Sequence, residues 1–225
     1  MAYIPIFLDV TGRECMVVGG GEVAARKVES LLQAGASVKV VSPSLSPQLS
    51  AAVGGGLATH VARQYQPGDM RGCVMVYAAT DDPKLQRDLV TEARSLGILI
   101  NVVDVPELCT FISPAVVNRG DLQIAISTGG ASPAFAARLR RALEDQFGTE
   151  YALTLKVLRE ARRRLHADEI DPADRMRRLK ELADSALPDA IAVRDVAAID
   201  LILATCLGDG VGLAALGLEL AEDSP

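Results

Sequence analysis

The chain has 225 residues, a net charge of −6 and an apolar fraction of 49%. This length fits one large domain, or a medium domain with a smaller one, and the apolar fraction is ample for a packed core. The negative charge, the lack of a basic tract and an aromatic content of only 4% argue against nucleic-acid binding. No apolar stretch reaches membrane-spanning length, since Arg194, Asp195 and Asp200 interrupt the longest one.

The four cysteines, Cys15, Cys73, Cys109 and Cys206, are scattered and form no C-x-x-C pair. We therefore expect free thiols, mostly buried, in a reducing compartment. Residues 1–5 contain no basic region and no signal-peptide core. Together these features predict a soluble, cytoplasmic protein.

The most informative stretch is residues 14–35. A short apolar run leads into Gly19-Gly20-Gly21, and a helical pattern follows. This order matches G-x-G-x-x-A, with Gly19, Gly21 and Ala24 in the key positions. Gly19 would let the chain turn sharply, Gly21 would let a pyrophosphate approach the backbone, and the amides at the helix start would favour a phosphate. The pattern indicates a dinucleotide site, although three glycines in a row also occur in plain flexible turns.

Alternating strands and helices surround this motif. Residues 4–10 read as an edge strand or an arm. Further strands are predicted at residues 38–41, 57–62, 73–79 and 98–103, with helices at 46–52, capped by Ser46, and at 83–96, capped by residues 80–82. This alternation predicts an α/β domain with a Rossmann-like, doubly wound parallel sheet.

The pattern changes after residue 109. Residues 110–117 and 122–127 read as two strands with no room for a helix between them, so they should be antiparallel. Ser132 is expected to cap a helix that reaches about residue 147.

From residue 151 the chain is predicted to be helical. Helices are expected at about 151–166, 172–186 and 189–207, and Val196, Ile199, Leu203 and Cys206 lie on one apolar stripe of the last helix. The tail, residues 208–225, is expected to be loose over its last few residues.

Four candidate sites fall at the carboxyl ends of predicted parallel strands, where open α/β sheets bind ligands. These are residues 19–23, residues 42–44, Thr80 with Asp81, and Asp104. Asp104 is placed to act as a base if the crevice is partly dry. The alternative is an aspartate that only stabilises a turn before Pro106.

Other residues leave alternatives open. Ser42 stands where NAD sites often have an acid, and its hydroxyl could bind a ribose; no cation that could hold a 2′-phosphate follows before Arg63, so NAD is favoured over NADP. Thr80 and Asp81 read first as a helix cap. Arg138, with Arg140 and Arg141, could meet an anionic substrate or form a solvated helix face. Neither histidine has partners at metal-ligand spacing, so no metal site is expected.

Five motifs together resemble the precorrin-2 dehydrogenases of siroheme synthesis, the N-terminal module of siroheme synthases. They lie in order at the family's spacing across about residues 1–150: Tyr3–Phe7, Val17–Lys27, Ala79–Asp82, Asn101–Asp104 and Ser127–Pro133. Beyond residue 150 the likeness is only of a helical tail.

This resemblance implies three parts: an NAD-binding Rossmann domain over residues 1–109, a small α+β dimerisation segment over 110–150, and a helical domain over 151–225. It implies NAD-dependent oxidation of the tetrapyrrole precorrin-2 to sirohydrochlorin, in a homodimer. Some members of the family also insert ferrous iron into the product.

The resemblance also implies site residues. Asp104 matches the family's key acid. Cofactor contacts are expected from Gly19, Gly21, Glu22, Val23, Pro43, Ser44, Thr80 and Asp81, and substrate contacts from Thr128, Ser132 and Arg138. Thr128 stands where some relatives have Ser, which keeps the hydroxyl. The alternative function is a regulatory domain that binds NAD without chemistry; it would need no acid in the crevice.

Overall fold

The computed structural model describes residues 3–167 and 170–220, which form two compact units. The first unit ends at Ser113 and the second begins at Pro114. The sequence places the end of the first domain slightly earlier, after residue 109. The further division at residue 150 stays a prediction, because residues on both sides of it belong to the second unit.

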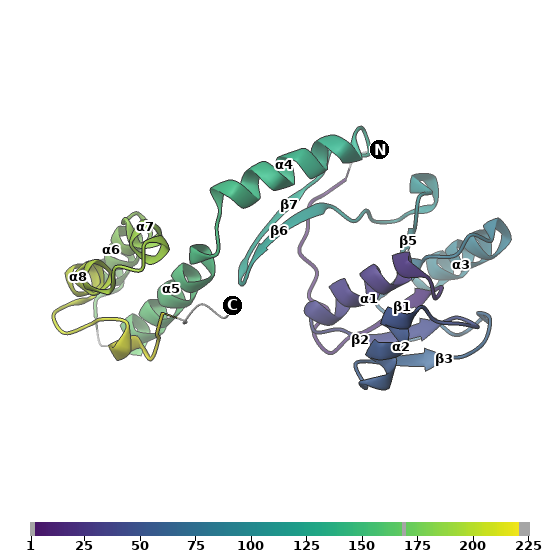
Figure 1. Cartoon of the computed structure of the whole chain (residues 1–225), viewed down its shortest axis with the longest axis horizontal. Coiled ribbons are helices and arrows are strands. Elements are labelled where there is room, and N and C mark those ends of the chain that lie inside the picture. Colours follow the sequence, from purple (N-terminus) through teal and green to yellow (C-terminus); the bar gives the residue numbers. More distant parts are fainter. Residues whose placement is uncertain (1–2, 168–169, 221–225) are drawn as a thin grey trace. The chain divides into compact units, whose positions relative to one another are not determined.

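The first unit is built on five parallel strands in the order β3-β2-β1-β4-β5 (Figure 1). The strands are β1 (Glu14–Val18), β2 (Ser37–Val41), β3 (Ala58–Val61), β4 (Met75–Ala78) and β5 (Leu99–Val102). This order places β1 at the centre, as in the Rossmann fold. The predicted fold class is confirmed.

Helices cover both faces of this sheet. On one face, α1 (Glu22–Gln33) and α2 (Pro47–Gly54) pack on inward-facing residues of β1 and β2 such as Val17 and Val40. On the other face, α3 (Pro83–Leu96) packs on residues such as Met16 and Val76. Because both faces are covered, the central strands are almost continuously apolar.

The predicted helix caps are present. The Ser46 hydroxyl accepts a hydrogen bond from the Leu49 amide at 3.4 Å. The Asp82 carboxylate accepts hydrogen bonds from the amides of Lys84 and Leu85.

The first residues form an arm rather than an edge strand. Residues 3–10 have no regular structure, and the side chains of Ile4, Ile6 and Phe7 are exposed. Val10 is buried where the arm meets the first core.

The loop after β3 is fixed by an ion pair. Arg63 donates two hydrogen bonds to the Asp69 carboxylate, Nη1 to Oδ2 at 2.6 Å and Nη2 to Oδ1 at 2.8 Å. The Gln66 amide donates to the same carboxylate at 2.9 Å. These bonds, with the Arg63 bonds as the largest cause, hold the pKa of Asp69 below its ordinary value of 3.8.

The second unit begins with an antiparallel hairpin, as the sequence predicts. Strands β6 (Ala115–Arg119) and β7 (Leu122–Ile126) are joined by Gly120-Asp121, with Gly120 at a φ of 65°. Helix α4 (Pro133–Gln146) runs beside this hairpin (Figure 1). The Ser132 hydroxyl caps α4 by accepting from the Phe135 amide, as predicted.

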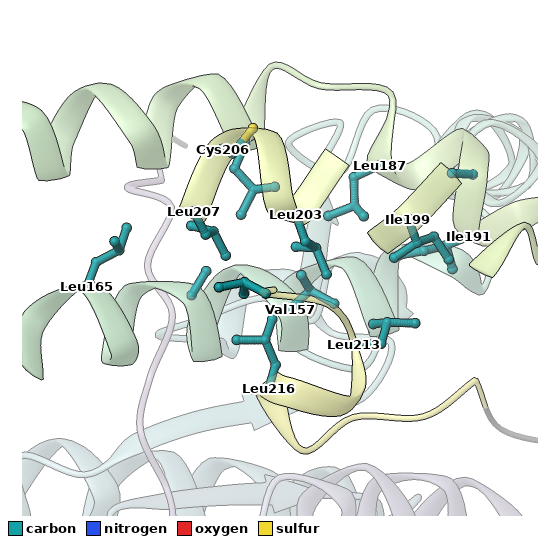
Figure 2. Close-up of a cluster of buried hydrophobic side chains, with 14 residues drawn as sticks. Val157, Leu165, Leu187, Ile191, Ile199, Leu203, Cys206, Leu207, Leu213 and Leu216 are labelled. Atoms are coloured by element: carbon teal, nitrogen blue, oxygen red, sulfur yellow. The ribbon is translucent and has the colours of Figure 1, made fainter. Parts of the chain in front are cut away.

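Four further helices share one apolar core (Figure 2). They are α5 (Glu150–Ala167), α6 (Pro172–Ala183), α7 (Leu187–Ala192) and α8 (Val196–Leu207). Figure 2 shows Leu203 of α8 pointing toward Val157 of α5, and both side chains are fully buried.

The single helix predicted for residues 189–207 is wrong, because the chain breaks between α7 and α8. Arg194 adopts a φ of 59°, which a continuous helix cannot contain. Asp195 then caps α8 by accepting from the Ala198 amide at 2.9 Å. Asp195 therefore marks the start of α8, and it was missed in the sequence because apolar residues recur on both sides of it.

Most of the predicted apolar stripe is buried. Ile199, Leu203 and Cys206 lie in the core, whereas Val196 in the first turn of α8 is 48% exposed. The tail up to residue 220 packs on the core through residues such as Leu213 and Leu216. The predicted loose end, residues 221–225, lies outside the described residues.

All four cysteines are free, as predicted. Cys15, Cys73 and Cys206 are buried and Cys109 is half-buried. Among the described residues no helix combines the length and the apolar character needed to cross a membrane.

We expect Leu203→Ala to lower the free energy of unfolding by about 2–5 kcal/mol, because it opens a cavity in the second core. Leu201→Ala on the same helix is the matched control; Leu201 is 68% exposed, so a change within about 0.5 kcal/mol is expected. Urea unfolding of the full chain, followed by circular dichroism, measures both. Equal losses in the two variants would contradict the described packing.

The Asp69 carboxylate should make stability depend on pH. A carboxyl whose pKa is lowered in the folded state stabilises that state above its unfolded pKa, and the stabilisation is lost as the pH falls through the folded pKa. Wild type should therefore exceed Asp69→Asn in thermal stability by a constant amount between pH 5 and 8. The difference should shrink as the pH falls below 3.8. A difference that grows in acid would refute this assignment.

Candidate functional site

The turn after β1 is a corner of close backbone contacts. Gly19 has a φ of 126°, and a Cβ at this position would lie 2.1 Å from the Ala79 carbonyl oxygen. Its amide donates to the Val41 carbonyl at 3.0 Å. Only glycine fits here, so the turn requires Gly19 for both its conformation and its lack of a side chain.

Gly20 is as tightly constrained, although the G-x-G-x-x-A fingerprint leaves its position open. A Cβ on Gly20 would lie 1.8 Å from the Ser44 carbonyl oxygen and 2.6 Å from the Ser42 hydroxyl. The Ser46 amide also donates to the Gly20 carbonyl at 2.7 Å. The run of three glycines was the available signal, since it contains one more glycine than the fingerprint needs.

Gly21 faces open space instead. A Cβ at this position would meet no atom within 4 Å. Gly21 is the N-cap of α1, and no side chain caps this helix. The first amides of an uncapped helix lack intrahelical partners, so those of Glu22 and Val23 are donors that could bind an anion beside open space. This cradle fits a dinucleotide pyrophosphate.

At the end of β2, Ser42 has a structural role, and the ribose contact suggested by its position stays a prediction. Its hydroxyl is buried and donates to the Ser44 carbonyl at 2.7 Å, and His60 Nε2 donates to the Ser42 carbonyl at 2.9 Å. Pro43 and Ser44 are exposed at this corner. The Arg63 guanidinium already forms an ion pair with the Asp69 carboxylate.

At the end of β4, Thr80 is half-buried and Asp81 is exposed. The side chain that caps α3 is Asp82, so the reading of Thr80 and Asp81 as the cap itself is wrong. The Thr80 hydroxyl accepts from the Asp82 amide at 3.4 Å, and its carbonyl accepts from Gln86 Nε2 at 2.7 Å. Thr80 is therefore fixed next to the glycine corner, and Asp81 faces solvent.

Asp104 follows β5 with a φ of 60°, in the left-handed region. Non-glycine residues are uncommon there, although aspartate is enriched. Its side chain is exposed, so the partly dry crevice expected around it is not seen within this unit. Across residues 3–167 and 170–220 its carboxylate accepts no hydrogen bond and forms no ion pair within 4.0 Å. A turn-stabilising aspartate would bond the backbone, as Asp9 does with Thr11.

The first residues of the strand predicted over 110–117 lie instead along the outer edge of β5, because β6 begins only at Ala115. The Thr110 amide donates to the Ile100 carbonyl at 2.8 Å, and the Ile100 amide donates to the Thr110 hydroxyl at 2.8 Å. Asn101 Nδ2 donates to the Phe111 carbonyl at 3.0 Å. These bonds fix residues 109–113 beside β5, close in sequence to Asp104.

Lys27 of α1 and Tyr77 of β4 both contact Ser113, at the end of this segment. Lys27 Nζ donates to the Ser113 hydroxyl at 3.3 Å and lies 5.0 Å from the centroid of the Tyr77 ring. Tyr77 lies in the strand predicted for residues 73–79, and the sequence pattern did not identify it as a site residue. The available signal for Lys27 was its position one turn after Val23 on the motif helix, since residues four apart share a face.

The predicted substrate residues lie in the second unit. The Thr128 hydroxyl donates to the Ser132 carbonyl and accepts from the Ser132 amide, both at 3.2 Å. Arg138 is exposed, with its guanidinium carbon 4.9 Å from the centroid of the Phe135 ring. Arg140 instead pairs with Glu144. In this unit the hydroxyls therefore shape the turn, and Arg138 offers a cation.

No group of three or more His, Cys, Asp or Glu side chains in the described part of the chain could hold a metal ion. His60 donates to a backbone carbonyl, and His166 accepts from Arg175 at 3.2 Å.

Two family models match the chain in succession. An NAD(P)-binding family covers residues 6–115, and the central domain of sirohaem biosynthesis proteins covers residues 119–146.

Curated relatives are siroheme synthases. That of Methylobacillus flagellatus is 46% identical over 151 residues, which cover 67% of this chain and 32% of the relative. That of Nitrosococcus oceani is 45% identical over 144 residues, which cover 64% of this chain and 31% of the relative. The chain thus spans about a third of the length of the curated relatives that it matches.

A solved structure titled "SirC, precorrin-2 dehydrogenase" is similar along almost its whole length. It superimposes with a TM-score of 0.70 at 26% identity, covering 84% of this chain and 94% of that chain. The two family models, the relatives and this structure agree with one another. The chain belongs to the siroheme synthase family, and its residues 6–115 and 119–146 correspond to the NAD(P)-binding and central domains of that family.

Proposed function

We propose that the protein oxidises precorrin-2 to sirohydrochlorin with NAD as the oxidant. The observation that carries this proposal is an unengaged carboxylate, Asp104, at the same sheet edge as an uncapped glycine corner. The similarity to a solved chain titled precorrin-2 dehydrogenase supports the substrate.

The glycine corner would hold the coenzyme. The amides of Glu22 and Val23 would bind the pyrophosphate, with Gly19 shaping the turn and Gly21 leaving room for the phosphates. Pro43 and Ser44, Thr80 and Asp81 would line the two neighbouring strand ends. NAD is favoured over NADP because Arg63, the first cation after β2, is engaged by Asp69.

Dehydrogenation removes two electrons and two protons from the tetrapyrrole. NAD held at the glycine corner would supply the hydride acceptor, which leaves one proton to be removed. The Asp104 carboxylate, exposed and without a hydrogen-bond donor among the described residues, is available to accept this proton. Its left-handed backbone conformation is a local strain of the kind found at functional positions.

Substrate contacts from the second unit remain part of the proposal. Arg138 would pair with a carboxylate of the tetrapyrrole, since its guanidinium forms no ion pair within the described residues. Thr128 and Ser132 would contribute through the turn that their hydrogen bonds shape.

Three further expectations follow from family membership. They are a homodimer formed through residues 110–150, insertion of ferrous iron as a second substrate, which only some members of the family carry out, and a cytoplasmic location. The four free thiols support a reducing compartment.

A matched pair of glycine variants tests the coenzyme site. Gly20→Ala forces a methyl group against the Ser44 backbone and should lower the free energy of unfolding by about 1–3 kcal/mol. Gly21→Ala places its methyl group in open space, so the melting temperature should hold while the Kd for NADH rises about tenfold. Fluorescence titration with NADH and thermal unfolding measure the two effects. Unchanged NADH affinity in Gly21→Ala would refute the proposed pyrophosphate position.

Asp104→Asn tests the proton acceptor. It keeps the shape of the side chain but removes its basicity, so kcat should fall by about 10²–10⁴ while the Kd for NADH stays constant. NADH absorbance during incubation with NAD and precorrin-2 reports the rate. A wild-type rate in the variant would show that Asp104 is not the base. NADH binding without turnover in the wild type would instead favour the NAD-sensing alternative.

A further inference from the structure

Three hydrogen-bonding groups of the first unit converge beneath α1. Lys27 Nζ lies 3.3 Å from Ser113 Oγ, and the Tyr77 hydroxyl lies 3.2 Å from the same Ser113 oxygen. Ser113 is exposed, while Lys27 and Tyr77 are half-buried. An ammonium and two hydroxyls therefore meet at a point that solvent can reach.

Lys27 has no counter-ion at this point. Within the described part of the chain no carboxylate lies within 4.0 Å of its ammonium. Burial is the largest influence and lowers the pKa of Lys27, with Arg26 acting in the same direction and Asp104 in the opposite one. Partial burial of an unpaired cation is unfavourable, so this position costs stability unless an anion arrives.

The surroundings hold the three groups in place. The Tyr77 ring packs edge-on against Phe111 with the centroids 5.4 Å apart, and Asn101 holds the Phe111 carbonyl. Asn101 also pairs with Tyr77 in the register of β4 and β5. A cluster fixed in this way loses little freedom when a ligand binds.

A purely structural role would be for Lys27 to fasten residue 113 to α1. A single hydrogen bond of 3.3 Å to an exposed hydroxyl is a weak fastening for a charged group. It also leaves two ammonium protons without a hydrogen-bond acceptor among the described residues. The free donor capacity and the uncompensated charge point to an anionic ligand.

We propose that Lys27, Tyr77 and Ser113 bind one carboxylate group of the tetrapyrrole substrate. This inference rests on the proposed function and adds a substrate contact to it from the first unit. A carboxylate fits the cluster because it accepts charge-assisted hydrogen bonds from the ammonium and the hydroxyls. The charge of Asp104 also acts on Lys27 and raises its pKa, against the larger effect of burial.

The test compares Lys27→Met with Arg26→Met, which removes an exposed cation from the adjacent position of α1. Sirohydrochlorin is titrated into the full chain without coenzyme, followed by tetrapyrrole fluorescence, and NADH is titrated separately. In Lys27→Met we expect the Kd for sirohydrochlorin to rise about tenfold, with the NADH affinity unchanged and the melting temperature not lowered, because an unpaired, half-buried charge is removed. Arg26→Met should match wild type, and Lys27→Arg should recover part of the loss.

Salt provides a second measurement. The Kd of wild type for sirohydrochlorin should rise with ionic strength more steeply than that of Lys27→Met, because one ion pair fewer is screened in the variant. Tyr77→Phe and Ser113→Ala should each weaken binding less than Lys27→Met.

Two results would overturn the inference: unchanged sirohydrochlorin affinity in Lys27→Met, or equal losses of sirohydrochlorin affinity, NADH affinity and melting temperature. The second would show that Lys27 is only structural. Both leave the proposed function standing as long as wild type reduces NAD with precorrin-2. Failure of wild type to do so contradicts the proposed function itself.

Discussion

The approach of three backbone segments at Gly19 and Gly20 is the constraint on which the first unit depends. Main-chain atoms of this turn contact Ala79 after β4 and Ser44 after β2 at distances that admit no Cβ. The ends of β1, β2 and β4 are therefore tied at one edge of the sheet. Every proposed coenzyme contact lies on the segments that meet there, so their mutual positions follow from this packing rather than from the flexibility of a loop.

The start of α1 illustrates how function departs from local stability. Helices α2, α3, α4, α6 and α8 each begin with a side chain that caps the first amides. Helix α1 begins at a glycine and has no such cap. A serine or aspartate would stabilise this helix by about 1 kcal/mol, but it would occupy the amides that a phosphate needs. The missing side-chain cap is consistent with a ligand that binds the free amides at the start of α1.

Much of this architecture could be predicted from the sequence because its signals are local. Apolar runs, the glycine motif and Ser46, Asp82 and Ser132 at helix starts gave the strands, the helices and the sheet class. The break at Arg194 was missed because apolar periodicity continues across it. The roles of Gly20, Ser42 and Lys27 were missed for another reason: each depends on residues distant in the chain, such as Ser44, His60 and Ser113, whose proximity exists only after folding.

The central place of β1 has a consequence for the order of events during synthesis. This strand pairs with β2 and with β4, so it emerges from the ribosome with both edges bare. One edge is covered once residues 37–41 are made, and the other must wait for residues 75–78. Parallel pairings of such separation close slowly, whereas a core of neighbouring helices forms from near-sequence contacts. We therefore expect the first unit to complete its sheet more slowly than the helical core forms.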